Sequence, residues 1–119
     1  MFAEHLKSVV DRVDGGIGAL LMGLDGIAID TYIADGNKID INTLGMEFSF
    51  ILTQIKKAAD ILRLGGIDEL VVRAESLYLC VRMISPEYFL AVVLGANGNF
   101  GKCRFHMRMA HPKLAEALA

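Results

Sequence analysis

The sequence predicts an α+β fold, an α/β sandwich with one five-stranded antiparallel sheet and three helices in the order helix-β-β-helix-β-β-β-helix. Three segments repeat apolar residues at helical spacing, and between them stand short apolar runs of strand length, first two and then three. Turn residues join the runs within each group, and such short connections favour antiparallel pairing. We expect the long second helix on one face of the sheet and the first and last helices on the other.

The first helix and the first pair of strands come from residues 2–34. Apolar residues at helical spacing over residues 2–14 predict an amphipathic helix that "DGG" ends: Phe2, Leu6, Val9, Val10 and Val13. The runs "IGALLMG" and "IAIDTYIA" then flank "LDGI". Asp25-Gly26 favours a two-residue type I′ turn, which needs positive φ at both central residues, so these strands are predicted to be antiparallel neighbours.

The longest helix is predicted over about residues 41–64, with Asn42 or Thr43 as its cap and "LGG" as its end. At about 100° per residue, one apolar face is expected to cover the sheet: Leu44, Phe48, Ile51, Ile55, Ala58, Ala59 and Leu62. A second stripe lies on nearly the opposite face: Met46, Phe50, Thr53, Lys57, Ile61 and Leu64.

The second stripe of this helix indicates a covered surface. A helix on one side of a sheet needs a single apolar stripe, so a further stripe with Phe, Met and Ile favours an interaction surface. The alternative is a stripe buried inside the monomer.

The runs "IDELVVRAE", "SLYLCVRMI" and "YFLAVVLGA" predict three further strands, the last two joined by "SPEY" with Pro86 at a turn position. In the first of them, Leu70, Val71 and Val72 place apolar groups on both faces. The charged residues around them are typical of a sheet edge that is exposed or paired in a defined register: Asp68, Glu69, Arg73 and Glu75. Homodimerisation through this strand and the long helix is the simplest hypothesis.

The segment "LGANGNFGKC", residues 94–103, resembles a phosphate-binding loop but departs from its pattern. Ala96 stands where the first glycine belongs, and Cys103 replaces the hydroxyl residue that would ligate Mg²⁺. We therefore interpret it as the turn that begins the last helix, whose continuity Pro112 interrupts or bends.

Composition predicts one folded domain, residues 1–119, with 54% hydrophobic residues. A net charge of −2 disfavours a nucleic-acid partner, and no apolar run is long enough for membrane insertion. Two isolated cysteines, Cys80 and Cys103, and an amphipathic amino terminus favour a cytoplasmic protein with reduced thiols.

Chemical motifs are weak, and the sequence predicts no catalytic residue, no metal site and no cofactor. The positions of His5, His106 and His111 match no metal-ligand pattern. Cys80 is interpreted as a core residue in a strand, and Cys103, beside Lys102 and Arg104, is expected to have a lowered pKa.

The order of elements, the "LMGLDGIAID" hairpin and the ending "GANGNFGKCRFHMRMAHPKLAEAL" resemble the Roadblock/dynein light chain family over essentially the whole chain. Within it they resemble the bacterial MglB-type proteins, which act with small Ras-like GTPases. The resemblance implies a homodimer in which the third strands join two sheets and the second helices lie side by side. It implies a non-catalytic adaptor or activator role that binds a Ras-like small GTPase in polarity, motility or trafficking.

Carried onto this sequence, the resemblance places the dimer edge at Leu70, Val71, Val72 and Arg73. The partner-facing helix is then the one that bears Met46, Phe50, Thr53, Lys57 and Ile61. Arg63 and Arg73 stay open as arginines that could reach a bound GTPase. The alternative function is a small-molecule sensor with a ligand between the sheet and a helix, which would need polar groups in that apolar layer.

Overall fold

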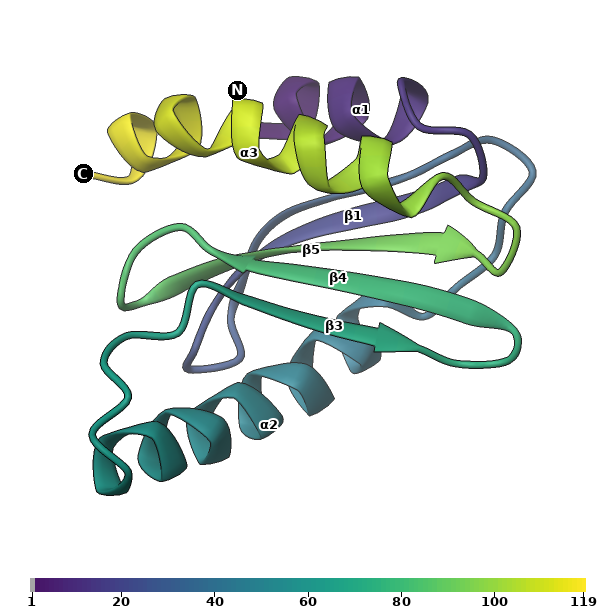
Figure 1. The fold of residues 1–119 in the computed structure, drawn as a ribbon. Coiled ribbons are helices and arrows are strands. Elements are labelled where there is room, and N and C mark those ends of the chain that lie inside the picture. The colour runs from purple at the N-terminus through teal and green to yellow at the C-terminus, as the bar shows by residue number, and fades with distance from the viewer. Residues whose placement is uncertain (1) are drawn as a thin grey trace.

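The computed structural model describes residues 2–119, and its elements follow the predicted order (Figure 1). The helices are α1 (Phe2–Asp11), α2 (Ile41–Ile61) and α3 (Phe100–Leu118). The strands are β1 (Gly16–Gly23), β2 (Ala28–Ile33), β3 (Glu69–Arg73), β4 (Leu77–Met83) and β5 (Tyr88–Gly95).

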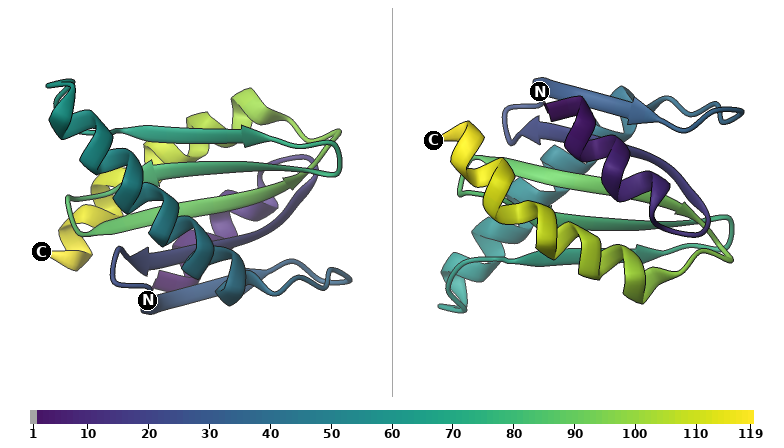
Figure 2. Two further views of the ribbon diagram at one scale, coloured as in Figure 1. Left: turned by 90° about the horizontal axis from the view of Figure 1, so that it is seen from below. Right: turned by 90° about the horizontal axis from the view of Figure 1, so that it is seen from above.

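The strands form one antiparallel sheet in the order β2-β1-β5-β4-β3. Pairing of β5 with β1 joins the two predicted strand groups, which leaves β2 and β3 as the two edges. Helix α2 covers one face of the sheet, and α1 and α3 lie together on the other (Figures 1 and 2). The predicted fold class is confirmed.

The β1–β2 hairpin has a different turn from the predicted one. The Gly23 amide donates to the Ile27 carbonyl at 3.0 Å, so the loop holds three residues, and only Gly26 among them has positive φ, at 84°. This is a type I turn followed by a left-handed glycine. Asp25 contributes its Oδ1, which accepts from the Ile27 amide at 3.0 Å. Antiparallel pairing of the two strands is confirmed, and the type I′ assignment is wrong.

Helix α2 begins at a different cap from the predicted ones. Asp40 is the N-cap: its Oδ1 accepts from the Thr43 amide at 3.1 Å and its Oδ2 from the Thr43 hydroxyl at 2.7 Å. Asn42 and Thr43 lie in the first turn, so both predicted caps are wrong. At the other end Arg63, with φ of 56°, takes the left-handed conformation just past the helix.

Helix α3 starts at the cap Asn99, whose Oδ1 accepts from the Lys102 amide at 3.0 Å. It continues through Pro112 to Leu118, so the predicted interruption is wrong. Pro112 removes one amide donor from the helix, and the turns on both sides of it remain helical.

Two apolar layers hold the sheet between the helices. One lies beneath α1 and α3 and includes Leu6, Leu90 and Leu114, and the other lies beneath α2 and includes Leu52 and Phe89. The central strands β1 and β5 are buried on both faces. Their sequences are therefore nearly continuous apolar runs, because side chains on both faces lie in the core. The layer between α2 and the sheet is filled by apolar side chains.

Candidate functional site

Strand β3 lies at the edge of the sheet, as its mixed composition predicts. The Met83 amide donates to the Asp68 carbonyl and the Ala74 amide to the Leu77 carbonyl, both at 2.9 Å. Since hydrogen-bonding direction alternates along an antiparallel strand, the backbone groups of Glu69, Val71 and Arg73 point away from β4. Within residues 2–119 no strand pairs with this side of β3.

The side chains of β3 divide between the two faces of the sheet. Leu70 and Val72 pack against the apolar layer beneath α2. Glu69 lies on the α3 face, where its Oε1 is 2.6 Å from Arg104 Nε, an ion-pair contact at an angle outside that of a hydrogen bond. Arg73 also lies on this face, over the rings of Tyr78 and Phe100.

The face that α2 buries against the sheet differs from the predicted face. The buried residues are Ile41, Gly45, Ser49, Leu52 and Ala59. Ile51 and Leu62, expected in the core, are exposed, and Leu44, Phe48 and Ile55 are half-buried. The helix is therefore rotated from the predicted orientation. Small residues mark the buried side because they allow α2 to approach the sheet closely: a Cβ on Gly45 would contact Leu20 and Met22.

The outer face of α2 carries most of the predicted partner-facing residues at the surface. Met46, Phe50 and Ile61 expose 59%, 65% and 81% of their surface. Lys57 is exposed, whereas Thr53 is half-buried and its hydroxyl donates to the Ser49 carbonyl at 2.9 Å. The apolar second stripe is therefore not covered by residues 2–119.

A further exposed apolar flank of α2 was missed from the sequence because its residues were assigned to the core. Leu44 and Phe48 are half-buried in the apolar layer beneath α2, which also contains Leu70 and Val72 of β3. Ile51 and Leu62 continue the flank and are exposed. Figure 2 shows α2 crossing the sheet from the β2 side toward β3.

The glycine-rich segment after β5 is a packed junction, as interpreted from the sequence. The Gly95 amide donates to the Gly15 carbonyl at 2.9 Å, and the Asn99 amide donates to the Asp14 carbonyl at 3.0 Å. With the Lys102 amide bound to the Asn99 side chain, these backbone donors are engaged within the protein. They hold the start of α3 against the turn that follows α1.

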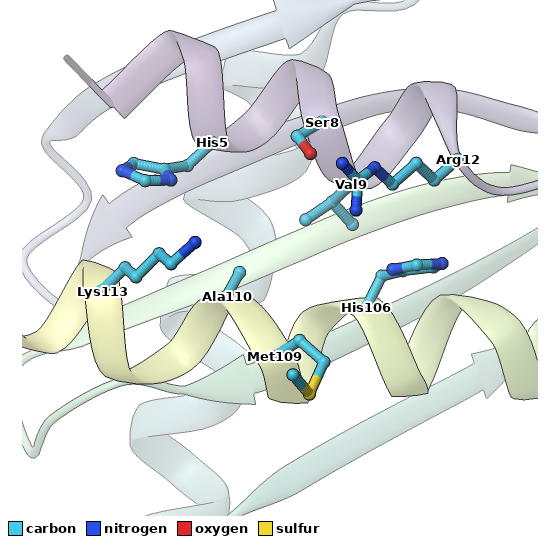
Figure 3. A pocket seen from close by; sticks show the side chains of 8 residues that line it. All are labelled: His5, Ser8, Val9, Arg12, His106, Met109, Ala110 and Lys113. Carbon is cyan, nitrogen blue, oxygen red and sulfur yellow. The ribbon is translucent and has the colours of Figure 1, made fainter.

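A small hollow lies between α1 and α3 on the face opposite α2 (Figure 3). Its volume is about 80 Å³. It is lined by His5, Ser8 and Val9 from α1, by Arg12 directly after that helix, and by His106, Met109, Ala110 and Lys113 from α3.

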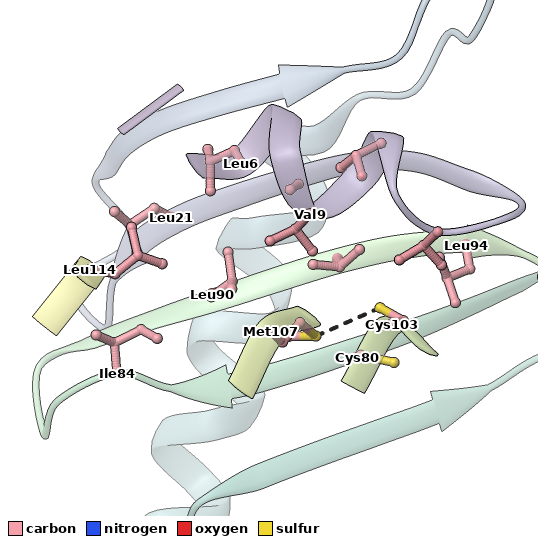
Figure 4. Close-up of a cluster of buried hydrophobic side chains, with 14 residues drawn as sticks. Leu6, Val9, Leu21, Cys80, Ile84, Leu90, Leu94, Cys103, Met107 and Leu114 are labelled. Carbon is pink, nitrogen blue, oxygen red and sulfur yellow. Dashed lines mark hydrogen bonds between the residues drawn. The ribbon is translucent and has the colours of Figure 1, made fainter. Parts of the chain in front are cut away.

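The two cysteines meet in the core between β4 and α3 (Figure 4). Cys80 is buried, which confirms its interpretation as a core residue. Cys103 is fully buried, and its Sγ lies 3.7 Å from Met107 Sδ. Hydrogen bonding with the Cys80 thiol and burial raise the pKa of Cys103, so the predicted lowered pKa is wrong. The reason is that Cys103 faces the sheet rather than the flanking Lys102 and Arg104 at the helix surface.

His111 has a defined structural environment: its Nδ1 accepts a hydrogen bond from Arg82 Nε at 2.9 Å. Burial and the nearby Arg82 lower the pKa of His111. Among residues 2–119, no cluster of three His, Cys, Asp or Glu side chains is arranged to hold a metal ion. The helices in this range include none with the length and hydropathy required to cross a membrane.

Comparison with solved structures, rather than with family models or curated sequences, relates the chain to known proteins. No family model matches the sequence, and no curated protein matches it. MglC from Myxococcus xanthus is 39% identical, with 98% of each chain covered and a TM-score of 0.71.

Two further structures share the fold. An MglB solved in a tetrameric arrangement is 22% identical over 95% of this chain and 84% of that chain, with a TM-score of 0.86. A Roadblock/LC7 domain from Streptomyces avermitilis is 21% identical over 98% of this chain and 96% of that chain, with a TM-score of 0.83. The chain belongs to the Roadblock/dynein light chain (Roadblock/LC7) family and is similar to its MglB and MglC members.

Proposed function

We propose that this protein is a non-catalytic, homodimeric adaptor that binds a Ras-like small GTPase. The observation that carries the proposal is the uncovered apolar surface of α2 beside the open edge of β3, because monomeric proteins rarely leave such a surface exposed. Membership of the family supports the same conclusion.

The dimer would form through β3, whose outward backbone groups need a strand partner. In antiparallel pairing of two copies centred on Val71, Glu69 lies opposite Arg73 of the second copy, and by symmetry this opposite-charge pair occurs twice. Centring the pair on Val72 would place Glu69 opposite Glu75 of the second copy, a like-charge contact that is destabilising. Charge therefore favours the register centred on Val71.

The two exposed surfaces of α2 would then serve different partners. The flank with Ile51 and Leu62 is assigned to the second copy of the dimer, because α2 runs toward the β3 edge at which the two copies would join. The outer face, with Met46, Phe50, Thr53, Lys57 and Ile61, stays accessible in such a dimer and is assigned to the GTPase. Apolar side chains next to one lysine form a surface of the kind seen at protein interfaces, with an apolar centre and a polar rim.

Substitution of Phe50 by aspartate tests the outer face. Phe50→Asp is expected to weaken GTPase binding by about tenfold or more, because it places a charge at the centre of an apolar interface. Folding should be unaffected, since the side chain is 65% exposed. Affinity for the GTPase is measured by titration calorimetry, with circular dichroism as the folding check.

Ala117→Asp is the matched control, because it adds the same charge at an exposed position of α3, on the opposite face of the sheet. It should bind as the wild type does. Unchanged affinity of Phe50→Asp, or equal loss in both variants, would show that the outer face of α2 is not the binding surface.

A further inference from the structure

The hollow between α1 and α3 has a regular construction. The lining residues of α3 follow the spacing i, i+3, i+4, i+7, and those of α1 together with Arg12 follow the same spacing, so two rows face one another across the hollow. Figure 3 shows Lys113 on the side of His5, and His106 on the side of Arg12. Val9 and Ala110 lie between these two ends.

Every ionisable side chain that lines the hollow is basic or a histidine, although the whole protein has a net charge of −2. Neither Arg12 nor Lys113 forms an ion pair with any of residues 2–119. The acidic residues of α1 are Glu4 and Asp11; neither lines the hollow, and Asp11 is paired with Lys7 at 2.7 Å. The positive charge of the hollow is therefore not neutralised within the described part of the chain.

An exposed apolar ridge runs beside the hollow on α3. Phe105 and Met109 expose 52% and 58% of their surface and, being four residues apart, share one side of the helix. Since α2 lies on the other face of the sheet, a GTPase bound to α2 would not cover these residues.

We propose that the α1–α3 hollow is a second protein-binding surface, which docks an acidic amphipathic segment of a partner protein. Its two ends are seven residues apart on α3, from His106 to Lys113, which is about 10.5 Å at about 1.5 Å per residue. A helical segment with carboxylates at the same spacing places one at each end. Its apolar side chains between the carboxylates contact Val9 and Ala110, and those beside them contact Phe105 and Met109.

Size and charge favour a protein segment over other polyanions. A hollow of about 80 Å³ admits a carboxylate group but is too small for a nucleotide base with its sugar. The apolar floor and ridge match apolar side chains, whereas nucleic-acid sites combine strong positive charge with contacts along a phosphate backbone. With α2 engaged on the opposite face, the adaptor would hold two different partners at once.

The imidazole of His106 supplies an internal probe of the site. Burial lowers its pKa, and the nearby Arg12, directly after α1, and Lys102 on its own helix lower it further. A carboxylate docked between His106 and Arg12 would offset that repulsion and raise the pKa of His106. A rise in the pKa of His106 therefore reports binding in the hollow, whereas binding elsewhere on the surface would not cause it.

The test uses a fluorescent helical peptide of about 14 residues, roughly four turns, with glutamates seven residues apart and leucines between them. A matched peptide carries glutamine in place of every glutamate. We expect the acidic peptide to bind at least about tenfold more tightly than the glutamine peptide, because the uncharged peptide lacks charge complementarity to the basic hollow. NMR titration should show the pKa of His106 rising in the presence of the acidic peptide.

Variants locate the binding. Lys113→Glu and Arg12→Glu are each expected to weaken the acidic peptide about tenfold, because each replaces attraction by repulsion. Arg108→Glu is the matched control: it reverses the same charge at an exposed position of α3 that does not line the hollow, and it should bind as the wild type does.

Several outcomes would overturn the proposal. They are failure of the acidic peptide to bind, equal binding of the glutamine peptide, and an equal loss in Arg108→Glu. Tighter binding to phosphatidylserine vesicles or to single-stranded oligothymidine than to the peptide would assign the surface to a membrane or to nucleic acid instead. None of these results depends on GTPase binding, so the two proposals fail separately.

Discussion

At the scale of single residues, burial and hydrogen bonding decide behaviour that sequence neighbours do not. Cys103 follows Lys102 and precedes Arg104, and this sequence context predicts a lowered pKa. Adjacent residues of a helix point in different directions, however, so Cys103 faces the sheet while its neighbours lie at or near the surface. Cys80 was correctly predicted as a core residue, because it lies in a strand whose residues are mostly apolar.

His111 provides a prediction at the same scale. Its Nδ1 accepts from Arg82 only when the imidazole is neutral, and its pKa lies below the ordinary 6.5. Because the folded state disfavours the charged form, this contribution to stability is fully present above pH 6.5 and is lost as the pH falls through the lowered folded value.

The measurement is urea unfolding between pH 7.5 and 5.5. The wild type should lose stability on acidification, and His111→Gln, which keeps an acceptor for Arg82 but does not titrate, should lose about 1 kcal/mol less. His5→Gln is the control, because within residues 2–119 the structure shows no hydrogen bond to His5 like the one that Arg82 donates to His111. An identical loss in the wild type and His111→Gln would contradict the account.

At the scale of elements, the sequence predicted the type and order of every helix and strand but not the rotation of α2. Two apolar stripes run along different faces of this helix, and periodicity alone does not say which face meets the sheet. The informative residues are small: Gly45, Ser49 and Ala59 add little to an apolar stripe, yet they mark the side of closest approach. The N-cap of α2 was also missed. Asp40, Asn42 and Thr43 are all residue types that cap helices, and the backbone conformation, which the sequence pattern does not give, decides which of them is the cap.

The seating of α2 gives the prediction at this scale. Gly45→Ala is expected to destabilise the protein by about 1 kcal/mol, because overpacking against Leu20 and Met22 costs about 1–3 kcal/mol and helix propensity returns up to about 1. Gly66→Ala, where a Cβ meets no atom within 4 Å, should be neutral or stabilising. Thermal and urea unfolding of both variants check this, and a more stable Gly45→Ala protein would show that α2 is not tightly seated at Gly45.

At the scale of the whole molecule, turn residues and periodicity were enough to predict the sheet and its layers, because short connections leave few ways to pair five strands. Surfaces were predicted less completely. The sequence identified β3 as an edge and Met46, Phe50 and Ile61 as outward residues, but it could not show the α1–α3 hollow. That hollow is formed by two helices that are distant in sequence and lie beside each other. The spacing of residues within α1 or within α3 alone does not predict that the two helices are neighbours.

The central claim is a dimer joined at β3 that binds a Ras-like GTPase. Val71→Pro removes an amide that points away from β4, so it should block pairing with a second copy while leaving the β3–β4 ladder in place. The most direct measurement is light scattering coupled to size-exclusion chromatography. It is made on the wild type and on Val71→Pro, alone and with a Ras-like GTPase from the same organism loaded with a GTP analogue or with GDP.

We expect a wild-type mass of twice 13.0 kDa, a shift to a larger complex with the GTP-analogue form, and a monomeric Val71→Pro protein. A wild-type monomer that is indifferent to both nucleotide forms of the GTPase would contradict the central claim.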